Sequence, residues 1–406
     1  MNNKNIKVAI LGYGLEGRDA EKYFKTKKAN VTILDQKFDN NYLKNLDKYD
    51  LVVRSAGVYP YKPEFKNINI TSPTQLFFEN CKGKIIGVTG TKGKGTTSTL
   101  IYEIIKKSAK KVFLAGNIGK PYLELLPIID PETYVVLEMS SFQLIDMDVS
   151  PHISVVLNIT SDHMDWHKNQ DEYISAKRNI VLHQSKSDFA VINKEYVSSK
   201  NFGNLTKGKV IYFSKTSLNK KYKKGLLLRG QHNLENIAAA VRVAEILKIT
   251  DNTILDTVLN FKGLEHRLEL VKTINGVTFY NDSFATGPQP TIAAIKSFTV
   301  PETLILGGSD KGLDYEELRR EIEKRENVKN LILIGEIGQK IAGNIKNKNI
   351  INLGKTDMNK IVKKAYEITP KGGVVIFSPA AASFDMFENY KDRGNQFKKA
   401  VEKLKS

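Results

Sequence analysis

The sequence predicts an α/β protein of three domains, each built around a parallel sheet. Short apolar runs alternate with amphipathic stretches along the whole chain, which is typical of repeated strand–helix units. Two glycine-rich turns each follow an apolar run, and a third series of apolar runs begins after Gly263. At roughly 100–200 residues per domain, 406 residues suffice for several separate cores. We expect domains at 1–83, 84–263 and 264–406, respectively Rossmann-like, P-loop ATPase-like and Rossmann-like.

The apolar runs give the expected strands of each domain. The first domain has runs at 8–11, 31–35 and 51–53. The second has runs at 85–88, 134–137, 153–157 and 188–192, with helices expected at 96–108 and 230–247. The third has runs at 277–280, 303–306, 331–334 and 374–377. The polar, lysine-rich stretch 201–224 is expected to form β-hairpins or a loop.

Composition narrows the class of protein. The formal net charge is +18, but the lysines are spread along the chain, which favours solvated helix faces over a nucleic-acid surface. No apolar run approaches the ~20 residues of a membrane span, so no membrane insertion is expected. The single cysteine, Cys81, excludes an intramolecular disulfide and a multi-cysteine zinc site. The N-terminus leads directly into a strand-like run, so we expect no signal peptide and a cytoplasmic location.

A first glycine-rich loop follows the run at 8–11. Residues 12–17 read Gly-Tyr-Gly-Leu-Glu-Gly and match G-x-G-x-x-G, a turn that brings backbone close to a diphosphate. Asp35 stands where an acidic residue would contact a ribose. The loop is compatible with a nicotinamide or flavin dinucleotide, with another nucleotide diphosphate, or with a turn alone. Because the domain has room for one mononucleotide-sized half, a single nucleotide is favoured.

A second glycine-rich loop lies between the run at 85–88 and the next helix. Residues 87–97 read Gly-Val-Thr-Gly-Thr-Lys-Gly-Lys-Gly-Thr-Thr. Its N–H groups and the helix N-terminus would hold phosphates, and Lys94 would neutralise charge between the β- and γ-phosphates. The hydroxyl of Thr96 comes one residue later than in G-x-x-x-x-G-K-[ST]. The setting favours ATP over a purely structural turn.

With these motifs, the chain resembles the Mur ligases and the related folylpolyglutamate synthases. The loop at 90–96 resembles their G-T-N-G-K-x-[ST] sequence. Further family motifs follow in order over nearly the whole chain, at 138–144, 158–165, 231–236, 263–267, 281–283, 306–308, 378–385 and 393–395. The block at 378–395 resembles the D-glutamate-adding branch of the family.

The resemblance implies an ATP- and Mg²⁺-dependent ligase that acts without a nucleic-acid partner, and we expect a monomer. It would activate the carboxylate of UDP-N-acetylmuramoyl-L-alanine as an acyl phosphate, which the amine of D-glutamate would then attack. The ATP-binding residues implied by the family match are Gly90, Thr91, Lys92, Gly93, Lys94, Gly95, Thr96, Thr97, Asn236, Arg267 and Asp282.

The family match also implies a catalytic and metal-binding set. The catalytic residues would be Lys94, His163 and Lys177, and the metal ligands Thr96, Glu138, His163 and Lys177. Lys177 matches the lysine that the family carbamylates to make a metal-bridging anion. By pattern alone, Lys177 is one more lysine on a helix surface, and Glu138 is a solvated acid at a strand end.

Substrate contacts follow from the same match. The residues implied for the nucleotide sugar are Gly14, Leu15, Glu16, Asp35, Asn117, Ser140 and Gln143. Those implied for D-glutamate are Thr286, Lys311, Ser383 and Tyr390. Ser383 is expected to open a helix whose N-terminal N–H groups would suit an anion. Without the resemblance, the four residues implied for D-glutamate would be ordinary surface residues.

The chain departs from the family pattern at several of these positions. Lys92 replaces an asparagine, Phe284 a lysine and Tyr390 a phenylalanine, and Ser55-Ala56-Gly57 replaces Ser-Pro-Gly. Glu16 brings a negative side chain close to the expected diphosphate. Three alternatives therefore stay open: a sibling ligase that adds L-glutamate, L-alanine or a folate glutamate, a nicotinamide-dependent oxidoreductase, and a nucleic-acid binder.

Overall fold

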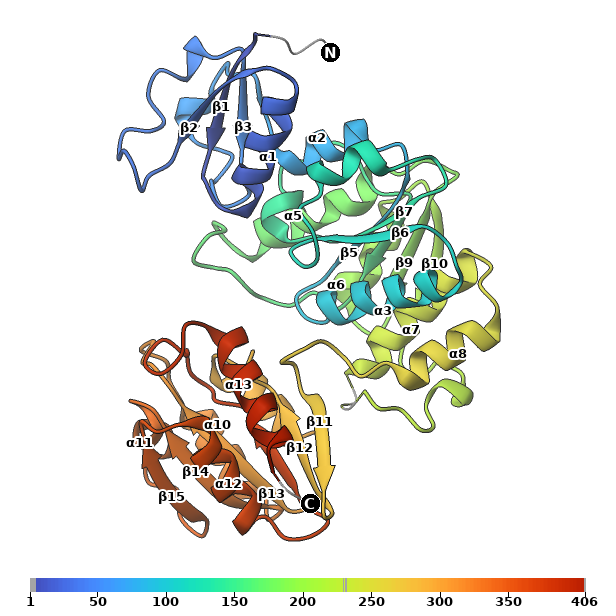
Figure 1. The fold of residues 1–406 in the computed structure, drawn as a ribbon. Helices are drawn as coiled ribbons and strands as arrows, with labels where there is room; N and C mark the ends of the chain where they lie inside the picture. The colour runs from blue at the N-terminus through green and yellow to red at the C-terminus, as the bar shows by residue number, and fades with distance from the viewer. Residues whose placement is uncertain (1–4, 229, 231, 405–406) are drawn as a thin grey trace. The chain divides into compact units, whose positions relative to one another are not determined.

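The computed structural model describes residues 5–228, 230 and 232–404. The chain forms two compact units, Met1–Lys224 with Leu234–Val258, and Gly225–Asn233 with Leu259–Ser406. We call these the first and the second unit, and each is described by itself. The described residues form three sheets, two in the first unit and one in the second (Figure 1). The boundaries expected at 83/84 and 263/264 stay predictions.

The first sheet of the first unit has four parallel strands in the order β2-β1-β3-β4. The strands are β1 (Lys7–Leu11), β2 (Asn30–Leu34), β3 (Leu51–Arg54) and β4 (Ile70–Thr71), with helices α1 (Leu15–Thr26) and α2 (Pro73–Asn80) and the 3₁₀ turns η1 (Leu46–Lys48) and η2 (Pro63–Phe65). Val8 and Ile10 pack with Phe24 of α1, while Ala9 and Leu11 pack on the opposite face. Because both faces are covered, β1 is a continuous apolar run.

The second sheet of the first unit has six parallel strands in the order β10-β9-β8-β5-β7-β6. The strands are β5 (Lys84–Thr89), β6 (Val112–Gly116), β7 (Tyr134–Glu138), β8 (Ile153–Val156), β9 (Phe189–Asn193) and β10 (Lys209–Phe213). The helices are α3 (Lys94–Lys107), α4 (Ser141–Leu144), α5 (Gln170–Leu182), α6 (Val197–Lys200), α7 (Asn233–Ile246) and α8 (Asp251–Asn260), and the 3₁₀ turns are η3 (Leu123–Ile128), η4 (Asn201–Asn204) and η5 (Lys220–Tyr222). The central strand, β5, leads into the second glycine-rich loop.

The sheet of the second unit has the order β11-β12-β16-β13-β14-β15, with β11 antiparallel to β12 and the other pairs parallel. The strands are β11 (Glu269–Ile274), β12 (Val277–Asn281), β13 (Glu302–Gly307), β14 (Val328–Ile334), β15 (Asn349–Gly354) and β16 (Val374–Phe377). The helices are α9 (Pro288–Ile295), α10 (Glu316–Lys324), α11 (Gly338–Ala342), α12 (Met358–Ile368) and α13 (Tyr390–Glu402). Separate apolar clusters cover the two faces of this sheet.

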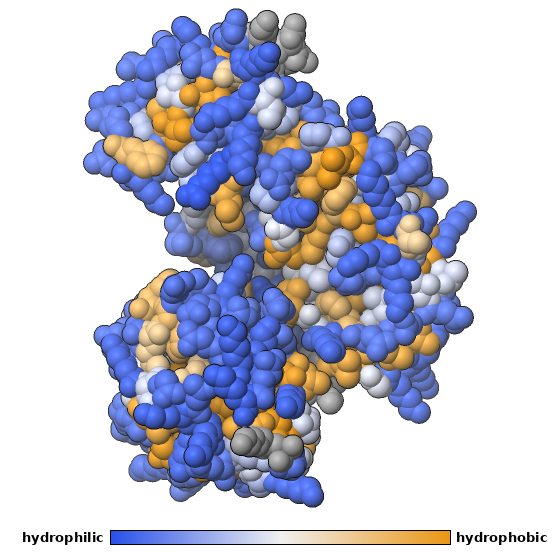
Figure 2. All heavy atoms as spheres, viewed as in Figure 1, coloured by the Kyte–Doolittle hydropathy of each residue, from blue (hydrophilic) through white to orange (hydrophobic). Residues whose placement is uncertain are grey.

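The α/β fold class predicted from the sequence is confirmed, and every apolar run expected to be a strand is one. The expectation for 201–224 is wrong in part, because this stretch contributes β10, which pairs in parallel with β9 at the edge of the sheet. Among the described residues, no helix is long and apolar enough to cross a membrane. On the face drawn in Figure 2, hydrophilic residues are spread over all parts of the chain, with hydrophobic residues showing between them.

Candidate active site

The first glycine-rich loop joins β1 to α1 and is fixed by polar contacts from both neighbouring strands. A Cβ on Gly17 would lie 2.1 Å from the carbonyl oxygen of Gly12, so only glycine allows α1 to start this close to β1. The Ser55 hydroxyl, after β3, donates to that same carbonyl oxygen at 2.7 Å. After β2, the Asp35 carboxylate accepts from the Tyr13 N–H at 2.6 Å. Hydrogen bonds from the N–H groups of Lys37 and Tyr13 lower the pKa of Asp35.

The second glycine-rich loop is closed over its own lysine. The Lys94 ammonium donates to the carbonyl oxygens of Gly90 and Thr91, at 3.1 Å each. Gly93 has a φ of 86°, and a Cβ there would lie 2.3 Å from Oδ1 of Asn236. The same Asn236 oxygen accepts from the Thr97 hydroxyl at 3.2 Å. These contacts fix the loop as a backbone turn at the N-terminus of α3, a geometry that suits phosphate.

The other residues expected at this loop differ in what they can contact. Thr91 is buried, and its hydroxyl bonds to the Tyr173 hydroxyl at 3.0 Å and the Thr160 carbonyl at 3.2 Å. Thr96 is buried in the first turn of α3. Lys92 is exposed, and its ammonium lies 3.7 Å from the Asp162 carboxylate. The extra charge of Lys92 therefore faces solvent and an acid.

Glu138 and Lys177 lie beneath the loop. Glu138 is the last residue of β7 and is 8% exposed. Lys177, on α5, is 1% exposed, and its amine bonds to the Thr89 hydroxyl at 3.2 Å and the Gly90 carbonyl at 3.1 Å. Burial, followed by repulsion from Lys94, holds the pKa of Lys177 well below its ordinary value. Lys177 is therefore a buried amine beneath the phosphate loop, and the interpretation as an ordinary surface lysine is wrong.

His163 lies in the loop after β8 with a left-handed backbone, at a φ of 57°. Its ring is partly exposed, packs 4.8 Å from the Phe142 ring, and has Nε2 3.9 Å from an Asp162 oxygen. The described residues bring together no group of three His, Cys, Asp or Glu side chains that could hold a metal. The donor set is one carboxylate, Glu138, with the Thr96 hydroxyl near the phosphate loop. This set fits Mg²⁺, which is commonly held by one or two carboxylates together with phosphate oxygens and water.

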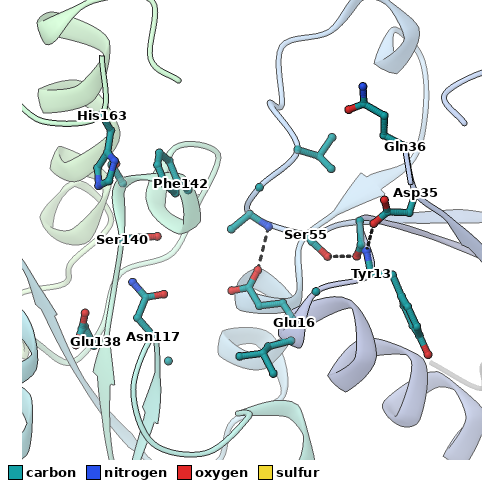
Figure 3. Close-up of a pocket in the computed structure, with 18 of the residues that line it drawn as sticks. Tyr13, Glu16, Asp35, Gln36, Ser55, Asn117, Glu138, Ser140, Phe142 and His163 are labelled. Carbon is teal, nitrogen blue, oxygen red and sulfur yellow. Dashed lines mark hydrogen bonds between the residues drawn. The ribbon is translucent and has the colours of Figure 1, made fainter. Parts of the chain in front are cut away.

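Lys94, Glu138, His163 and Lys177 line one cavity of about 710 Å³ in the first unit, here called the main cavity. One wall comes from the carboxyl ends of the first sheet, and the other from those of the second sheet. Figure 3 shows Tyr13, Glu16, Asp35, Gln36 and Ser55 on the first wall, and Asn117, Glu138, Ser140, Phe142 and His163 on the other. Gly14, Leu15, Lys94, Tyr173 and Lys177 line it as well. Ligands of parallel α/β sheets bind at such strand ends.

Glu16 and Gln143 are hydrogen-bonded to each other and to neighbouring groups. One Glu16 carboxylate oxygen accepts from Nε2 of Gln143 at 2.6 Å and from the Tyr122 hydroxyl at 2.7 Å. The other accepts from the Ala56 N–H at 2.9 Å (Figure 3). The Gln143 oxygen accepts from the Ser140 N–H at 2.9 Å, which completes a capping box at the start of α4. Both ends of the Gln143 amide are therefore occupied.

The sequence analysis missed a buried network at the rim of the main cavity. His167 bonds through Nε2 to the Ser141 hydroxyl at 2.8 Å, and its Nδ1 lies 3.3 Å from the Glu172 carboxylate. The same carboxylate accepts from the Tyr59 hydroxyl at 2.6 Å. Burial lowers the pKa of His167. The available signal was a second histidine four residues after His163, with Trp166, the one tryptophan of the chain, directly before it.

The second unit has a smaller pocket of about 230 Å³, here called the small pocket. It brings together the four residues expected for the amino acid, Thr286, Lys311, Ser383 and Tyr390, and it is also lined by Phe284, Ala382, Phe384 and Asn389. The expectation that Ser383 opens a helix is wrong. Residues 384–386 form only a turn, and α13 begins at Tyr390 with Asn389 as its N-cap. The Asn389 side chain accepts from the N–H groups at 391 and 392, so the cap forms six residues later than expected.

Two buried charges shape the small pocket. Arg393 is fully buried and donates to the Ser283 hydroxyl at 3.0 Å, the Ser283 carbonyl at 2.8 Å and the Ala382 carbonyl at 3.1 Å. It thereby joins the two loops that line the pocket. Asp282 accepts from the Leu268 N–H at 3.0 Å and the Ser378 hydroxyl at 2.7 Å. Burial raises the pKa of Asp282 to about 7.

Arg267 of the second unit lies on the Phe284 ring, with the guanidinium carbon 4.0 Å from the ring centroid. The Phe284 ring in turn meets Tyr390 edge-on at 5.0 Å. Asp282, through the Leu268 N–H, holds the segment that carries Arg267. The contacts of Arg267, Asp282 and Asn236 with a nucleotide stay predictions.

Comparisons with known proteins identify the family of the chain. Residues 88–229 match the Mur ligase middle domain, and residues 266–381 match the Mur ligase glutamate ligase domain. Two similar curated proteins are both named UDP-N-acetylmuramoylalanine--D-glutamate ligase. That of Acetivibrio thermocellus is 37% identical, over 99% of this chain and 97% of the relative. That of Clostridioides difficile is 36% identical, over the full length of both chains.

Similar solved structures support the fold. The Thermotoga maritima MurF ligase in complex with ADP has a TM-score of 0.60 at 20% identity, covering 99% of this chain and 96% of that one. The UDP-N-acetylmuramate-alanine ligase MurC of the same organism has a TM-score of 0.62 at 16% identity, covering 99% of this chain and all of the other. Two family domains and full-length relatives above one-third identity establish the relationship. The chain belongs to the Mur ligase family.

Proposed function

We propose that the chain is an ATP-dependent ligase that adds D-glutamate to UDP-N-acetylmuramoyl-L-alanine in peptidoglycan precursor synthesis. One observation carries the proposal. The first glycine-rich loop, suited to a nucleotide diphosphate, and the Lys94–Glu138–Lys177 group, suited to phosphoryl transfer, open into the same main cavity. A nucleotide-linked carboxylate bound there would reach the γ-phosphate of ATP. The names of the full-length relatives supply the identity of both substrates.

The nucleotide end of the substrate is assigned to the first sheet. Gly14 and Leu15 would approach the diphosphate, and Asp35 would lie near the uridine, since all three line the main cavity. This sheet has four strands in a single set, β2-β1-β3-β4. A dinucleotide normally spans two mononucleotide-binding halves, so the sheet suits one nucleotide and disfavours the oxidoreductase alternative.

The phosphate end is assigned to the second sheet. The N–H groups of residues 90–97 would hold the phosphates of ATP, and Lys94 would exchange its contacts with Gly90 and Thr91 for phosphate oxygens. Thr96 and Glu138 would hold Mg²⁺, whose chemistry is to neutralise phosphate charge. Asn117 and Ser140, at the ends of β6 and β7, would orient the acyl end of the sugar peptide. Positioning and charge stabilisation are the main contributions to such a transfer.

Lys177 is proposed to work as its carbamate. Burial lowers the pKa of Lys177 and so enlarges the neutral fraction of its amine, and the neutral amine is the form that adds to carbon dioxide. The neutral nitrogen forms a bond to the carbon of CO₂ and loses one proton, so a neutral amine becomes an anion; starting from the ammonium, two protons are lost. That anion would lie beneath the phosphate loop and beside Glu138, and it would convert the Lys177–Lys94 repulsion into attraction. His163 is proposed as a further metal or phosphate contact.

The amino acid is assigned to the small pocket, where Lys311 would pair with a carboxylate of D-glutamate and Thr286, Ser383 and Tyr390 would fix its orientation. In the first step, a carboxylate oxygen of the sugar peptide attacks the γ-phosphorus, and ADP leaves. In the second step, the deprotonated amine attacks the acyl carbon. Inorganic phosphate then leaves with that carboxylate oxygen, and the amine nitrogen gives up a proton as the amide forms.

We also propose that the enzyme works in the cytoplasm as a monomer. Sedimentation velocity at working concentration tests the second point. A single species at the mass of one chain, 45.6 kDa, is expected, and a stable dimer would contradict it.

The proposed function is tested by phosphate release from ATP with UDP-N-acetylmuramoyl-L-alanine, scanned over D-glutamate, L-glutamate and L-alanine, with a folate substrate tested in parallel. Only D-glutamate should support turnover. Lys94→Ala should lower turnover at least ~100-fold, because a charge on the transferring phosphate is lost. The matched control is Lys106→Ala, on an exposed lysine of the same helix, and it should keep full activity. Turnover only with another acceptor would assign the chain to a sibling ligase.

A further inference from the structure

We propose that the carboxylate of Glu16 is an internal anion that occupies the donors intended for a substrate phosphate, and that the diphosphate of the nucleotide sugar displaces it. This inference rests on the proposed function and deepens it, because it assigns Glu16 as a residue that sets the affinity for diphosphate-bearing ligands. The sequence analysis could only note that Glu16 brings negative charge to this place.

Three donors converge on the one carboxylate. They are the Gln143 amide at 2.6 Å, the Tyr122 hydroxyl at 2.7 Å and the Ala56 N–H at 2.9 Å. They come from α4, from the residue before η3, and from the loop after β3, which are far apart in the sequence. Hydrogen bonds to an ionised acceptor are roughly twice as strong as neutral ones, so this set is a receptor for an anion.

Glu16 and one of its donors, the Ala56 N–H, lie where the diphosphate is expected. Glu16, Gly14, Ala56 and Ser140 all line the main cavity, and Glu16 lies in the first turn of α1. Gln143 and Tyr122 are each 3% exposed, so neither can turn to water for another partner. A diphosphate placed beside Glu16 would face a like charge, which is unfavourable. Simultaneous occupation is therefore disfavoured, and one anion must replace the other.

Glu16 can leave without loosening the first unit, because other contacts tie the same segments together. Asp19, one turn further along α1, accepts from the N–H groups of Leu123 and Glu124 at 2.9 and 3.2 Å. Arg54, at the end of β3, forms two hydrogen bonds to Asp146 at 2.6 and 3.0 Å. Glu16 itself is only half-buried and lines the main cavity. Because the contacts of Asp19 and Arg54 already join these segments, the hydrogen bonds of Glu16 are not required to hold them together.

The inference is tested by calorimetric titration of the full chain with uridine, UDP and inorganic pyrophosphate, using wild type, Glu16→Thr and Glu16→Gln. Both variants should bind UDP and pyrophosphate at least fivefold more tightly, because no carboxylate has to be displaced. Uridine, which has no phosphate, should bind all three proteins within twofold. Glu132→Gln, on an exposed acid of the same unit, is the matched control for the change in net charge and should behave as wild type.

The outcomes separate this inference from the proposed function. Unchanged or weaker UDP binding in both variants, with uridine binding intact, would overturn the role of Glu16 and leave the nucleotide site standing. If none of the proteins, wild type included, bound UDP or uridine, the assignment of the first sheet to a uridine nucleotide would fail, and this inference with it. If Glu16→Thr unfolded, Glu16→Gln, which preserves the side-chain shape, would decide alone.

Discussion

Arg54 and Asp146 form a bidentate ion pair between the end of β3 and the segment after α4, with nitrogen–oxygen distances of 2.6 and 3.0 Å. The Arg54 side chain is fully buried and also donates to the Val58 carbonyl at 2.6 Å. The pair joins the two sheets of the first unit beside the main cavity. Because the Arg54 charge is buried, loss of this pair should lower stability more than loss of an exposed ion pair would.

Asp146→Asn should destabilise the first unit by about 3 kcal/mol, because it leaves the buried Arg54 charge without its counter-ion. Thermal unfolding followed by tryptophan fluorescence measures this, since Trp166 lies in the first unit. Glu245→Gln breaks a surface ion pair of the first unit, between Glu245 and Arg242 of α7, and is the control expected to leave the midpoint near that of wild type. Equal effects of the two changes would contradict the role given to Arg54.

Activity should depend on carbon dioxide through Lys177. Enzyme freed of bicarbonate should lose most of its turnover and regain it on addition of bicarbonate, and Lys177→Arg should be inactive under both conditions because a guanidinium does not form this carbamate. Carbon-13 NMR with labelled bicarbonate should show one carbamate signal in wild type that Lys177→Arg lacks. Lys186→Arg, on an exposed lysine after α5, should keep both the signal and the activity. Full turnover without bicarbonate would argue against a carbamate.

The contact between Arg267 and Phe284 should support ATP binding. Phe284→Ala removes the ring on which the guanidinium lies and should raise KM for ATP roughly 3- to 30-fold, the range expected for a cation–π contact. Phe384→Ala provides the comparison, because this exposed ring also lines the small pocket. It should change KM for D-glutamate more than KM for ATP. The same KM pattern in both variants would show that Phe284 has no separate role in holding Arg267.

Glu302 should make the second unit less stable at high pH. The side chain is fully buried at the start of β13, and burial raises its pKa to about 8 against the opposing effects of Arg325, Asn327 and Lys348. The folded state thus holds a proton that the unfolded state releases near pH 4.5. The free energy of unfolding should therefore fall as pH rises from about 4.5 to about 8, by a few kcal/mol at most.

Glu302→Gln tests this directly. The variant should have a shallower pH dependence over that window, with a part left from Asp282, whose pKa is raised to about 7, and should become more stable than wild type at pH 9, as measured by urea unfolding at several pH values. Glu402→Gln, on an exposed acid near the end of α13, should retain the wild-type slope. A wild-type slope of the opposite sign would show that Glu302 is stabilised as its anion.

Much of the fold could be predicted because a parallel strand buried on both faces is a continuous apolar run, as in residues 8–11. The strands that were missed are short, like β4, or lie at sheet edges, like β6, β11 and β15, where one side is less buried and the pattern is weaker. The helix expected after Ser383 failed because a serine beside an apolar residue fits a turn as well as a helix start.

The candidate site, like the fold, could be predicted from the sequence only in part. The two glycine-rich loops were predictable because their spacing encodes a local backbone geometry. The contacts of Glu16 were not, since its partners Tyr122 and Gln143 lie 106 and 127 residues away. The burial of Lys177 was equally hidden, because it depends on the packing of α5 beneath β5 and not on the residues next to it. Tertiary context decides both.

The most direct measurement follows the oxygen atoms of the reaction. UDP-N-acetylmuramoyl-L-alanine labelled with oxygen-18 in its free carboxylate is incubated with ATP, D-glutamate and the enzyme, and the released phosphate is analysed by mass spectrometry. If the two walls of the main cavity bind one substrate between them, one labelled oxygen should appear in each phosphate formed. Unlabelled phosphate, with the product amide still formed, would contradict transfer of the γ-phosphate to the substrate carboxylate.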